Sequence, residues 1–117
     1  MSCIFEIGDQ TVWSPALRVG NLYVRMAQSV AEVLGVPTGM SAMASDFWEI
    51  DIDVFEPFVH AMYGRYFSSS HEILKSLIGP ILAPSIVMLK RGGRIISPKS
   101  LEERDFIARS HNLSMAQ

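Results

Sequence analysis

Short runs of alternating hydrophobic and polar residues open the chain and predict a small β-hairpin. Residues 3–7 (Cys-Ile-Phe-Glu-Ile) and 11–13 (Thr-Val-Trp) have the composition of strands. Gly8, Asp9 and Gln10 lie between them, and glycine beside aspartate is typical of a tight turn. We therefore expect two antiparallel strands joined by this turn.

A helical period follows and predicts a helix over residues 15–34. Hydrophobic residues recur close to every 3.6 positions, at Leu22, Met26, Val30, Val33 and Leu34. Ser14 and Pro15 are typical of an N-cap and a first helical position. Gly35 suits the C-terminal cap, and Pro37 prevents the helix from continuing. Met26 lies on the hydrophobic face and is expected in the core.

The middle of the chain predicts a loop, a strand and a second helix. Residues 36–45 contain proline, glycine and serine and are expected to form a loop. Residues 47–51 (Phe-Trp-Glu-Ile-Asp) suggest a third strand. Asp51 or Asp53 can then cap a helix whose hydrophobic face runs from Phe55 to Tyr66. Pro57 is expected to distort its first turn.

The segment from Ser68 to Ile96 begins as a helix and then becomes ambiguous. Ser69 and Glu72 have the spacing of a capping box, and a hydrophobic stripe continues to Leu82. Pro80 and Pro84 are expected to kink or stop this helix. Residues 85–96 fit a hairpin with a Gly-Gly turn, or a last helical turn capped by glycine. We favour the hairpin, although periodicity alone does not decide between the two.

The C-terminal part predicts one more helix and a short tail. Ser97 and Pro98 introduce the helix, Ser100 and Glu103 have capping-box spacing, and the helix is expected to end near Ser110. We predict a single globular domain over residues 1–110 and a loose tail over residues 111–117. The expected class is α+β, with a small antiparallel sheet (the N-terminal hairpin plus further short strands) packed against three to four helices.

Composition supports this single-domain interpretation. The chain has 117 residues, of which 49% are hydrophobic and 19% charged, so extensive disorder is excluded. Its one cysteine, Cys3, cannot form an internal disulfide, which favours a reducing compartment. We expect no signal peptide and no membrane span, because the most hydrophobic window contains two prolines. A cytoplasmic location follows as an expectation.

Charge is distributed unevenly along the chain. Residues 1–60 hold eight acidic and two basic side chains, whereas residues 61–117 hold four acidic and eight basic ones. The net charge of −2 therefore conceals halves of −6 and +4. Such asymmetry can mark a surface for a polar partner, although the two halves can also interleave when the chain folds. The absence of a basic excess argues against nucleic-acid binding.

Residues 46–56, which we call the acidic segment, are the strongest candidate for partner binding. Five acidic side chains and no basic one fall within it, and three aromatic residues lie among them. A compact acidic surface steers a protein toward a basic partner, and an aromatic side chain can anchor the contact. The residues predicted to bind a partner are Asp46, Trp48, Glu49, Asp51, Asp53 and Glu56.

The same segment also allows a metal-site interpretation. Asp51, Asp53, Glu56 and His60 include an Asp-x-Asp pair and an i, i+4 pair, which are spacings that occur among metal ligands. However, carboxylates are common at helix starts, and no second histidine has metal spacing. We therefore predict no cofactor and no metal, and we keep a small metal-dependent enzyme as an alternative.

Other candidate nucleophiles and anion sites have simpler explanations. His71 follows three serines, but neighbouring side chains at a helix start point different ways, so helix capping is the expected role. Cys3 at the start of a hydrophobic strand is expected to pack in the core. Residues 90–94 (Lys-Arg-Gly-Gly-Arg) form a basic turn that lacks the P-loop pattern and is expected to be exposed. No catalytic residue is predicted.

Several short motifs, taken together, resemble a family of small uncharacterised bacterial single-domain proteins. They are Gly8-Asp9 with Trp13-Ser14-Pro15, then Leu34 to Gly39 (Leu-Gly-Val-Pro-Thr-Gly), Glu49-Ile50-Asp51, and Ser69-Ser70-His71. The resemblance runs over roughly residues 3–96. It implies a bacterial origin and a domain of unknown function, and it transfers no catalytic residues. Pro80 and Pro84 depart from the smoother helix expected at that place.

These observations predict a non-catalytic protein-binding module. In its most concrete form it is an immunity- or antitoxin-like protein that binds a basic partner, such as a toxin, through the acidic segment. The alternative from a different class is a structural homo-oligomer, because the hydrophobic segment from Leu77 to Leu89 can supply a shared interface. A homodimer is compatible with both interpretations.

Overall fold

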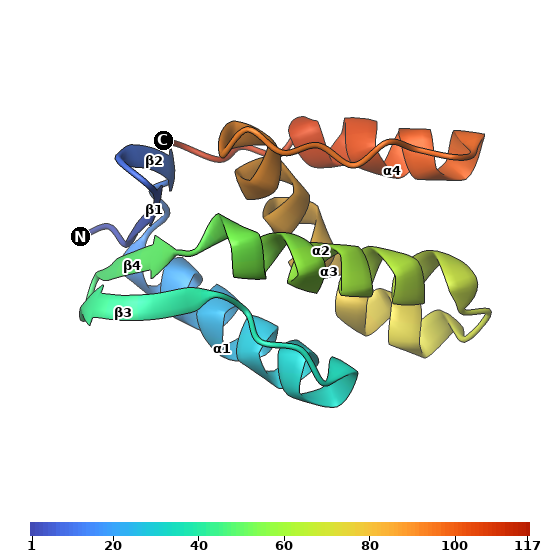
Figure 1. Cartoon of the computed structure of the whole chain (residues 1–117), viewed down its shortest axis with the longest axis horizontal. Coiled ribbons are helices and arrows are strands. Elements are labelled where there is room, and N and C mark those ends of the chain that lie inside the picture. Colours follow the sequence, from blue (N-terminus) through green and yellow to red (C-terminus); the bar gives the residue numbers. More distant parts are fainter.

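The computed structural model describes all 117 residues and contains four strands and four helices (Figure 1). The elements follow one another as β1 (Ile4–Ile7), β2 (Gln10–Trp13), α1 (Leu17–Leu34), β3 (Met40–Ala44), β4 (Phe47–Ile50), α2 (Ile52–Ser68), α3 (Glu72–Arg91) and α4 (Leu101–His111). The predicted α+β class is confirmed. The sheet occupies one end of the molecule, and the helices extend away from it.

The sheet is mixed, and not purely antiparallel as predicted. Its strand order is β2-β1-β4-β3, and the two hairpins β1–β2 and β3–β4 are antiparallel. The central pair, β1 and β4, is parallel. The reason is the connection: α1 carries the chain from one end of the sheet back to the other, as a crossover between parallel strands requires.

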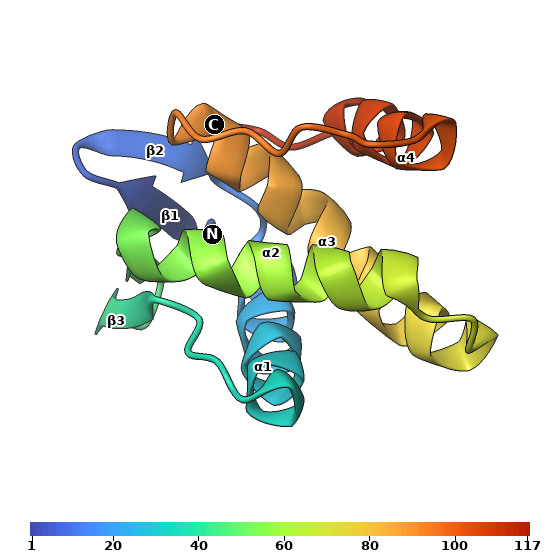
Figure 2. The same cartoon turned by 45° about the vertical axis from the view of Figure 1, so that its right-hand side comes forward.

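The helices cover one face of the sheet, as Figure 2 shows. Because side chains alternate along a strand, Cys3, Phe5 and Ile7 of the β1 segment point into the core and are buried. Phe58 of α2 and Leu82 of α3 belong to the same hydrophobic core and are fully buried. The opposite face of the sheet has no helix on it and stays open to solvent.

The helix ends follow local sequence signals in three cases and depart from them in one. Asp51 caps α2, the His71 Nδ1 accepts the amide of Leu74 at the start of α3, and the Ser100 hydroxyl accepts the amide of Glu103 at the start of α4. The Ser14 cap of α1 is not formed, because the helix begins only at Leu17 and no side chain caps it. Its C-terminal end has the predicted glycine, Gly35, in the left-handed conformation.

The predicted hairpin over residues 85–96 does not form, because α3 continues through both prolines to Arg91. A proline removes one backbone hydrogen bond, but burial of the segment outweighs that loss. All five residues from Ser85 to Leu89 are buried, so the helix is enclosed on every side where it crosses the core. Helix α3 is long and hydrophobic enough to cross a membrane by length and composition alone. Buried core helices of ordinary globular proteins meet the same two criteria.

Residues 40–44 form a strand, although the sequence predicts a loop there. Serine, alanine and methionine have no strong preference for strands, and β3 forms by pairing with β4. Gly39 makes the entry to β3 possible, because its φ of +78° lies in the left-handed region. A side chain there would also come within 2.8 Å of the Asp51 carbonyl oxygen and 2.9 Å of the Phe55 amide.

The segment expected to be a loose tail is attached to the sheet near its end. The Ser14 amide, directly after β2, donates to the Ala116 carbonyl over 2.7 Å, and the Met115 side chain is buried. The Arg91 guanidinium also donates to the Val12 carbonyl of β2 over 2.9 Å. Both chain ends therefore lie at the sheet end of the molecule (Figure 1).

Candidate functional site

The structure separates the six residues of the predicted partner site into three groups. Asp51, Asp53 and Glu56 lie at the start of α2, Glu49 lies on the open face of the sheet, and Asp46 and Trp48 have mainly structural contacts. The acidic segment is therefore not one continuous patch. Each group needs its own chemical interpretation.

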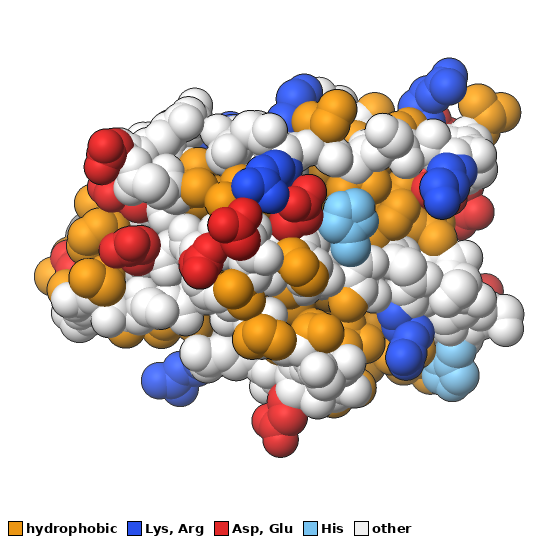
Figure 3. Space-filling view, in the orientation of Figure 1, with side chains coloured by type: hydrophobic (Ala, Val, Ile, Leu, Met, Phe, Trp, Pro, Cys, Tyr) orange, Lys and Arg blue, Asp and Glu red, His pale blue; other side chains and the backbone are white.

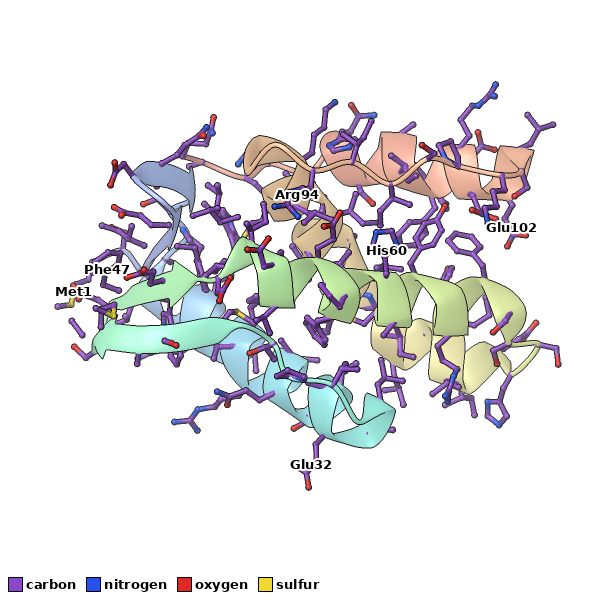
Figure 4. The ribbon with its side chains drawn as sticks, viewed as in Figure 1. Met1, Glu32, Phe47, His60, Arg94 and Glu102 are labelled. Atoms are coloured by element: carbon purple, nitrogen blue, oxygen red, sulfur yellow. The ribbon has the colours of Figure 1, made fainter.

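The acids at the start of α2 are largely engaged within the protein. Asp51 accepts the Asp53 amide as the N-cap. Arg94, in the segment after α3, donates to Asp53 over 2.9 Å and to Glu56 over 2.6 Å. These hydrogen bonds, first the one to Asp53 and then the one to Glu56, raise the pKa of Arg94 above its ordinary value. Figure 3 shows the basic side chain among the acidic ones, and Figure 4 identifies it as Arg94.

The alternative metal site is not assembled. Of its four proposed ligands, Asp51 caps a helix and two others bind Arg94. Figure 4 shows His60 on the same side of α2 as Arg94. The His60 Nε2 is 3.8 Å from the Glu56 Oε2. No three side chains of the types His, Cys, Asp or Glu are grouped so as to hold a metal ion. The arrangement instead fastens the segment after α3 onto α2.

Asp46 and Trp48 contribute to the sheet. The Asp46 carbonyl accepts the amide of Ile4 over 2.8 Å and joins the β3–β4 turn to β1. Trp48 lies opposite Phe5 in the register, on the inward face, and packs against the core. Its indole N–H is buried without a hydrogen-bond partner. Trp48 is therefore a partly buried residue that packs against the core, and its role as an aromatic anchor stays a prediction.

The other candidates of the sequence also have structural roles. The Cys3 thiol is buried in the core, and this burial raises its pKa. His71 caps a helix. In the basic turn, Arg91 binds the backbone of β2, and Arg94 binds the acids of α2. Two of its three basic side chains are thus already paired inside the molecule.

A row of four polar residues crosses the open face of the sheet, one from each strand. Thr11 pairs with Glu6, Glu6 with Glu49, and Glu49 with Ser41 in the strand register. We call these four residues the open-face row. Its centre consists of two carboxylates on adjacent strands, whose backbones lie about 4.8 Å apart. Neither Glu6 nor Glu49 takes part in any of the four ion pairs of the protein.

The neighbouring row on this face is hydrophobic. Ile4 pairs with Phe47, and both are only half-buried. Phe47 and Met1 both lie at the sheet end of the molecule in Figure 4. In Figure 3 this end carries interspersed acidic and hydrophobic side chains. The open face thus combines two unpaired charges with a half-buried aromatic side chain.

Sequence reasoning missed the pairing of Glu6 with Glu49. Glu6 lies in the first predicted strand and Glu49 in the acidic segment, and 43 positions separate them. Strand alternation places both on a polar face. Only the parallel pairing of β1 with β4 brings Glu6 and Glu49 side by side. No pattern of neighbouring residues in the sequence predicts that pairing.

Replacing Glu49 with glutamine is expected to stabilise the protein. Like charges directly opposite each other on neighbouring strands cost roughly 0.2–1 kcal/mol, so we expect the free energy of unfolding to rise by about 0.5 kcal/mol at neutral pH. Urea unfolding measures this change. The gain should fall at about 1 M salt, where the charges are screened.

The matched control is Asp105→Asn on α4, where no ion pair is lost. It removes one negative charge from an exposed position away from the sheet, and we expect no resolvable change in stability. A loss of stability in Glu49→Gln, or a gain that high salt leaves intact, contradicts the proposed repulsion.

Comparison with known proteins assigns the chain to a family. The whole chain, residues 1–117, matches the model of DUF6086, a family of unknown function. The chain therefore belongs to this family, and the resemblance inferred from the short motifs is confirmed. No curated protein and no solved structure matches the chain. Its function must be argued from its own residues.

Proposed function

We propose that the protein is a non-catalytic protein-binding module that engages a basic partner through the open face of its sheet. The observation that carries this proposal is the unpaired carboxylate pair at the centre of the open-face row, Glu6 and Glu49. A repulsive pair on the surface lowers stability without serving the fold. A partner that neutralises both charges removes this cost on binding.

The geometry suits one basic side chain placed between the two strands. Carboxylates that project from strands about 4.8 Å apart can both accept hydrogen bonds from a single guanidinium, whose donors are fixed in a planar fork. The hydroxyl groups of Thr11 and Ser41 flank the pair and can bind further polar groups. Ile4 and Phe47 supply hydrophobic contact beside the charges, which excludes water from them.

The proposal changes the partner site predicted from the sequence. Glu49 stays at its centre and Glu6 joins it, whereas Asp53 and Glu56 are held by Arg94. Asp46 and Asp51 flank the surface and add to its negative field. In its most concrete form the module is an immunity-like inhibitor that covers a basic active site, for example that of a toxin. Bacterial origin and a cytoplasmic location remain predictions.

The test is affinity capture with the full chain and two variants as baits. The double variant Glu6→Lys/Glu49→Lys reverses the carboxylate pair, whereas Asp105→Lys is the matched control that adds a positive charge on α4. Quantitative mass spectrometry identifies proteins retained by the wild type and the control but lost from the double variant. We expect one basic protein to behave in this way.

The purified partner then provides the decisive measurement. We expect its dissociation constant for the wild type to rise steeply with salt, because ion pairing drives the association. For the double variant the affinity should fall by about 100-fold or more, which is the effect of losing a central charge pair. If no protein distinguishes the double variant from the control, the open face is not the binding surface.

A further inference from the structure

Helix α1 has a second hydrophobic face that the fold does not cover. Its buried face consists of Gly20, Tyr23, Val24, Ala27 and Ala31. The larger hydrophobic residues Val19, Leu22, Met26 and Val33 lie on a different side of the helix and are 52%, 59%, 39% and 76% exposed. We call these four residues the exposed stripe. The prediction that Met26 belongs to the core is therefore wrong.

The exposed stripe continues onto α3. A groove of about 180 Å³ lies between the two helices, lined by Val30 and Val33 of α1 and by Leu74, Leu77 and Ile78 of α3. Leu77 is 62% exposed and Ile73, one turn before it, is 67% exposed. Six of the eleven exposed large hydrophobic side chains of the protein thus belong to the exposed stripe and this part of α3. Such a concentration marks an interaction surface.

We propose that a second copy of this chain covers the exposed stripe, with the two α1 helices packed antiparallel about a two-fold axis near Met26. Val19, Met26 and Val33 are seven residues apart, and Leu22 follows Val19 by three. This is the heptad spacing of helices that pack side by side. From Val19 to Val33 the stripe extends about 21 Å along the helix. An isologous contact needs one self-complementary surface, which this stripe supplies.

Charge complementarity argues for a second copy and for the antiparallel direction. The polar edge beside the stripe carries Arg18, Arg25 and Glu32, again seven residues apart. Arg18 and Glu32 lie at equal distances from Arg25, about 10.5 Å along the helix on either side. An antiparallel pair about this point therefore places Arg18 of each copy opposite Glu32 of the other.

A parallel pair, with its two-fold axis along the helices, would instead turn this edge toward the opposite edge of the partner helix. Arg18 and Glu32 would then not face each other, and their charge pairing would be lost. In the antiparallel pair only Arg25 lies near its counterpart, at the axis. Figure 4 shows Glu32 pointing away from the body of the molecule, where a second copy can reach it. None of the three residues forms an ion pair within the chain.

The first test measures mass in solution by light scattering over a range of protein concentrations. The wild type is expected to be dimeric at high concentration. Leu22→Lys/Val33→Lys places charges within the exposed stripe and should weaken the dimer by about 100-fold or more. Leu101→Lys is the matched control, because Leu101 is a 73% exposed leucine on α4. It should leave the dimer intact.

The second test examines the direction of packing and does not depend on hydrophobic contact. Arg18→Glu and Glu32→Arg should each weaken the dimer by about 3- to 10-fold, the range of favourable surface ion pairs. The double variant Arg18→Glu/Glu32→Arg restores opposite charges across an antiparallel interface and should recover wild-type affinity. Circular dichroism verifies that every variant is folded.

The outcomes separate this proposal from the proposed function. A wild type that stays monomeric at every concentration overturns the dimer, as does a lysine pair in the stripe that has no effect. A double charge variant weaker than either single one overturns the antiparallel direction. Glu6→Lys/Glu49→Lys should remain dimeric, because the open-face row lies outside this interface. Loss of partner binding and loss of the dimer are thus independently observable.

Discussion

Replacing Gly20 with alanine is expected to destabilise the protein by about 2 kcal/mol, within the range for overpacked cores. A Cβ atom at position 20 would lie 2.6 Å from the Cys3 Cβ and 2.7 Å from its sulfur. The segment before β1 must then move away from α1. Alanine favours a helix over glycine by about 1 kcal/mol, so the expected loss already includes an opposing gain.

Gly64→Ala provides the matched control. Gly64 lies inside α2, and nothing lies within 4 Å of a Cβ atom at that position. The same chemical change should therefore stabilise the protein by up to about 1 kcal/mol through helix propensity alone. Thermal or urea unfolding of both variants gives the comparison. If both substitutions change stability in the same direction, close packing of α1 on Cys3 is not the reason that position 20 is glycine.

Replacing Ser85 with alanine is expected to cost about 2–3 kcal/mol, because it leaves a buried hydroxyl without a partner. The Ser85 hydroxyl donates to the Ile81 carbonyl over 2.7 Å, and the Tyr23 hydroxyl lies 2.5 Å from it. With its proton committed to Ile81, Ser85 accepts from Tyr23. Burial raises the pKa of Tyr23, so its hydroxyl stays neutral and keeps the proton that it donates.

Replacing Tyr23, which donates to Ser85, should destabilise the protein less than replacing Ser85. Tyr23→Phe loses one hydrogen bond but leaves Ser85 bound to Ile81, so we expect a cost of about 1 kcal/mol. In the double variant no unpaired hydroxyl remains, and its stability should exceed that of Ser85→Ala alone. A double-mutant cycle by urea unfolding measures this rescue. Additive losses would show that the two hydroxyls do not depend on each other.

The sequence predicts the elements of this fold better than their pairing. The hairpin of residues 3–13, the end of α1 at Gly35 and the Ser100 cap of α4 all follow from neighbours within a few positions. The parallel contact between β1 and β4 has no local signal. The hydrophobic pattern of α1 also gave the wrong face, because Val19, Leu22, Met26 and Val33 are exposed, whereas the buried face includes Gly20, Ala27 and Ala31.

Two segments show how tertiary packing overrides local preference. The run from Ile86 to Leu89 suggests a strand by composition, but its enclosure within the core stabilises a helix. Residues 40–44 suggest a loop, but pairing with β4 makes them a strand. In both places the decisive partner is distant in the sequence, so a local pattern could not identify it.

The candidate site could be predicted only in part for the same reason. Glu49 was identified because acids cluster near it along the chain. Two members of that cluster, Asp53 and Glu56, are held by Arg94, which lies some 40 positions away. Glu6 belongs to the site only through the strand order. An acidic run along the chain therefore overstates the acidic surface that the fold presents.

The strand order also has a consequence for how the chain folds during synthesis. Strand β1 is synthesised first and lies inside the sheet, between β2 and β4. Strand β4 is completed only when Ile50 has been added. At typical elongation rates the intervening 43 residues take roughly 2–9 s to add. For that time β1 keeps an unpaired edge beside hydrophobic side chains. The nascent N-terminal part is then a natural client for chaperones, and slow codons between β2 and β4 should lower the yield of folded protein.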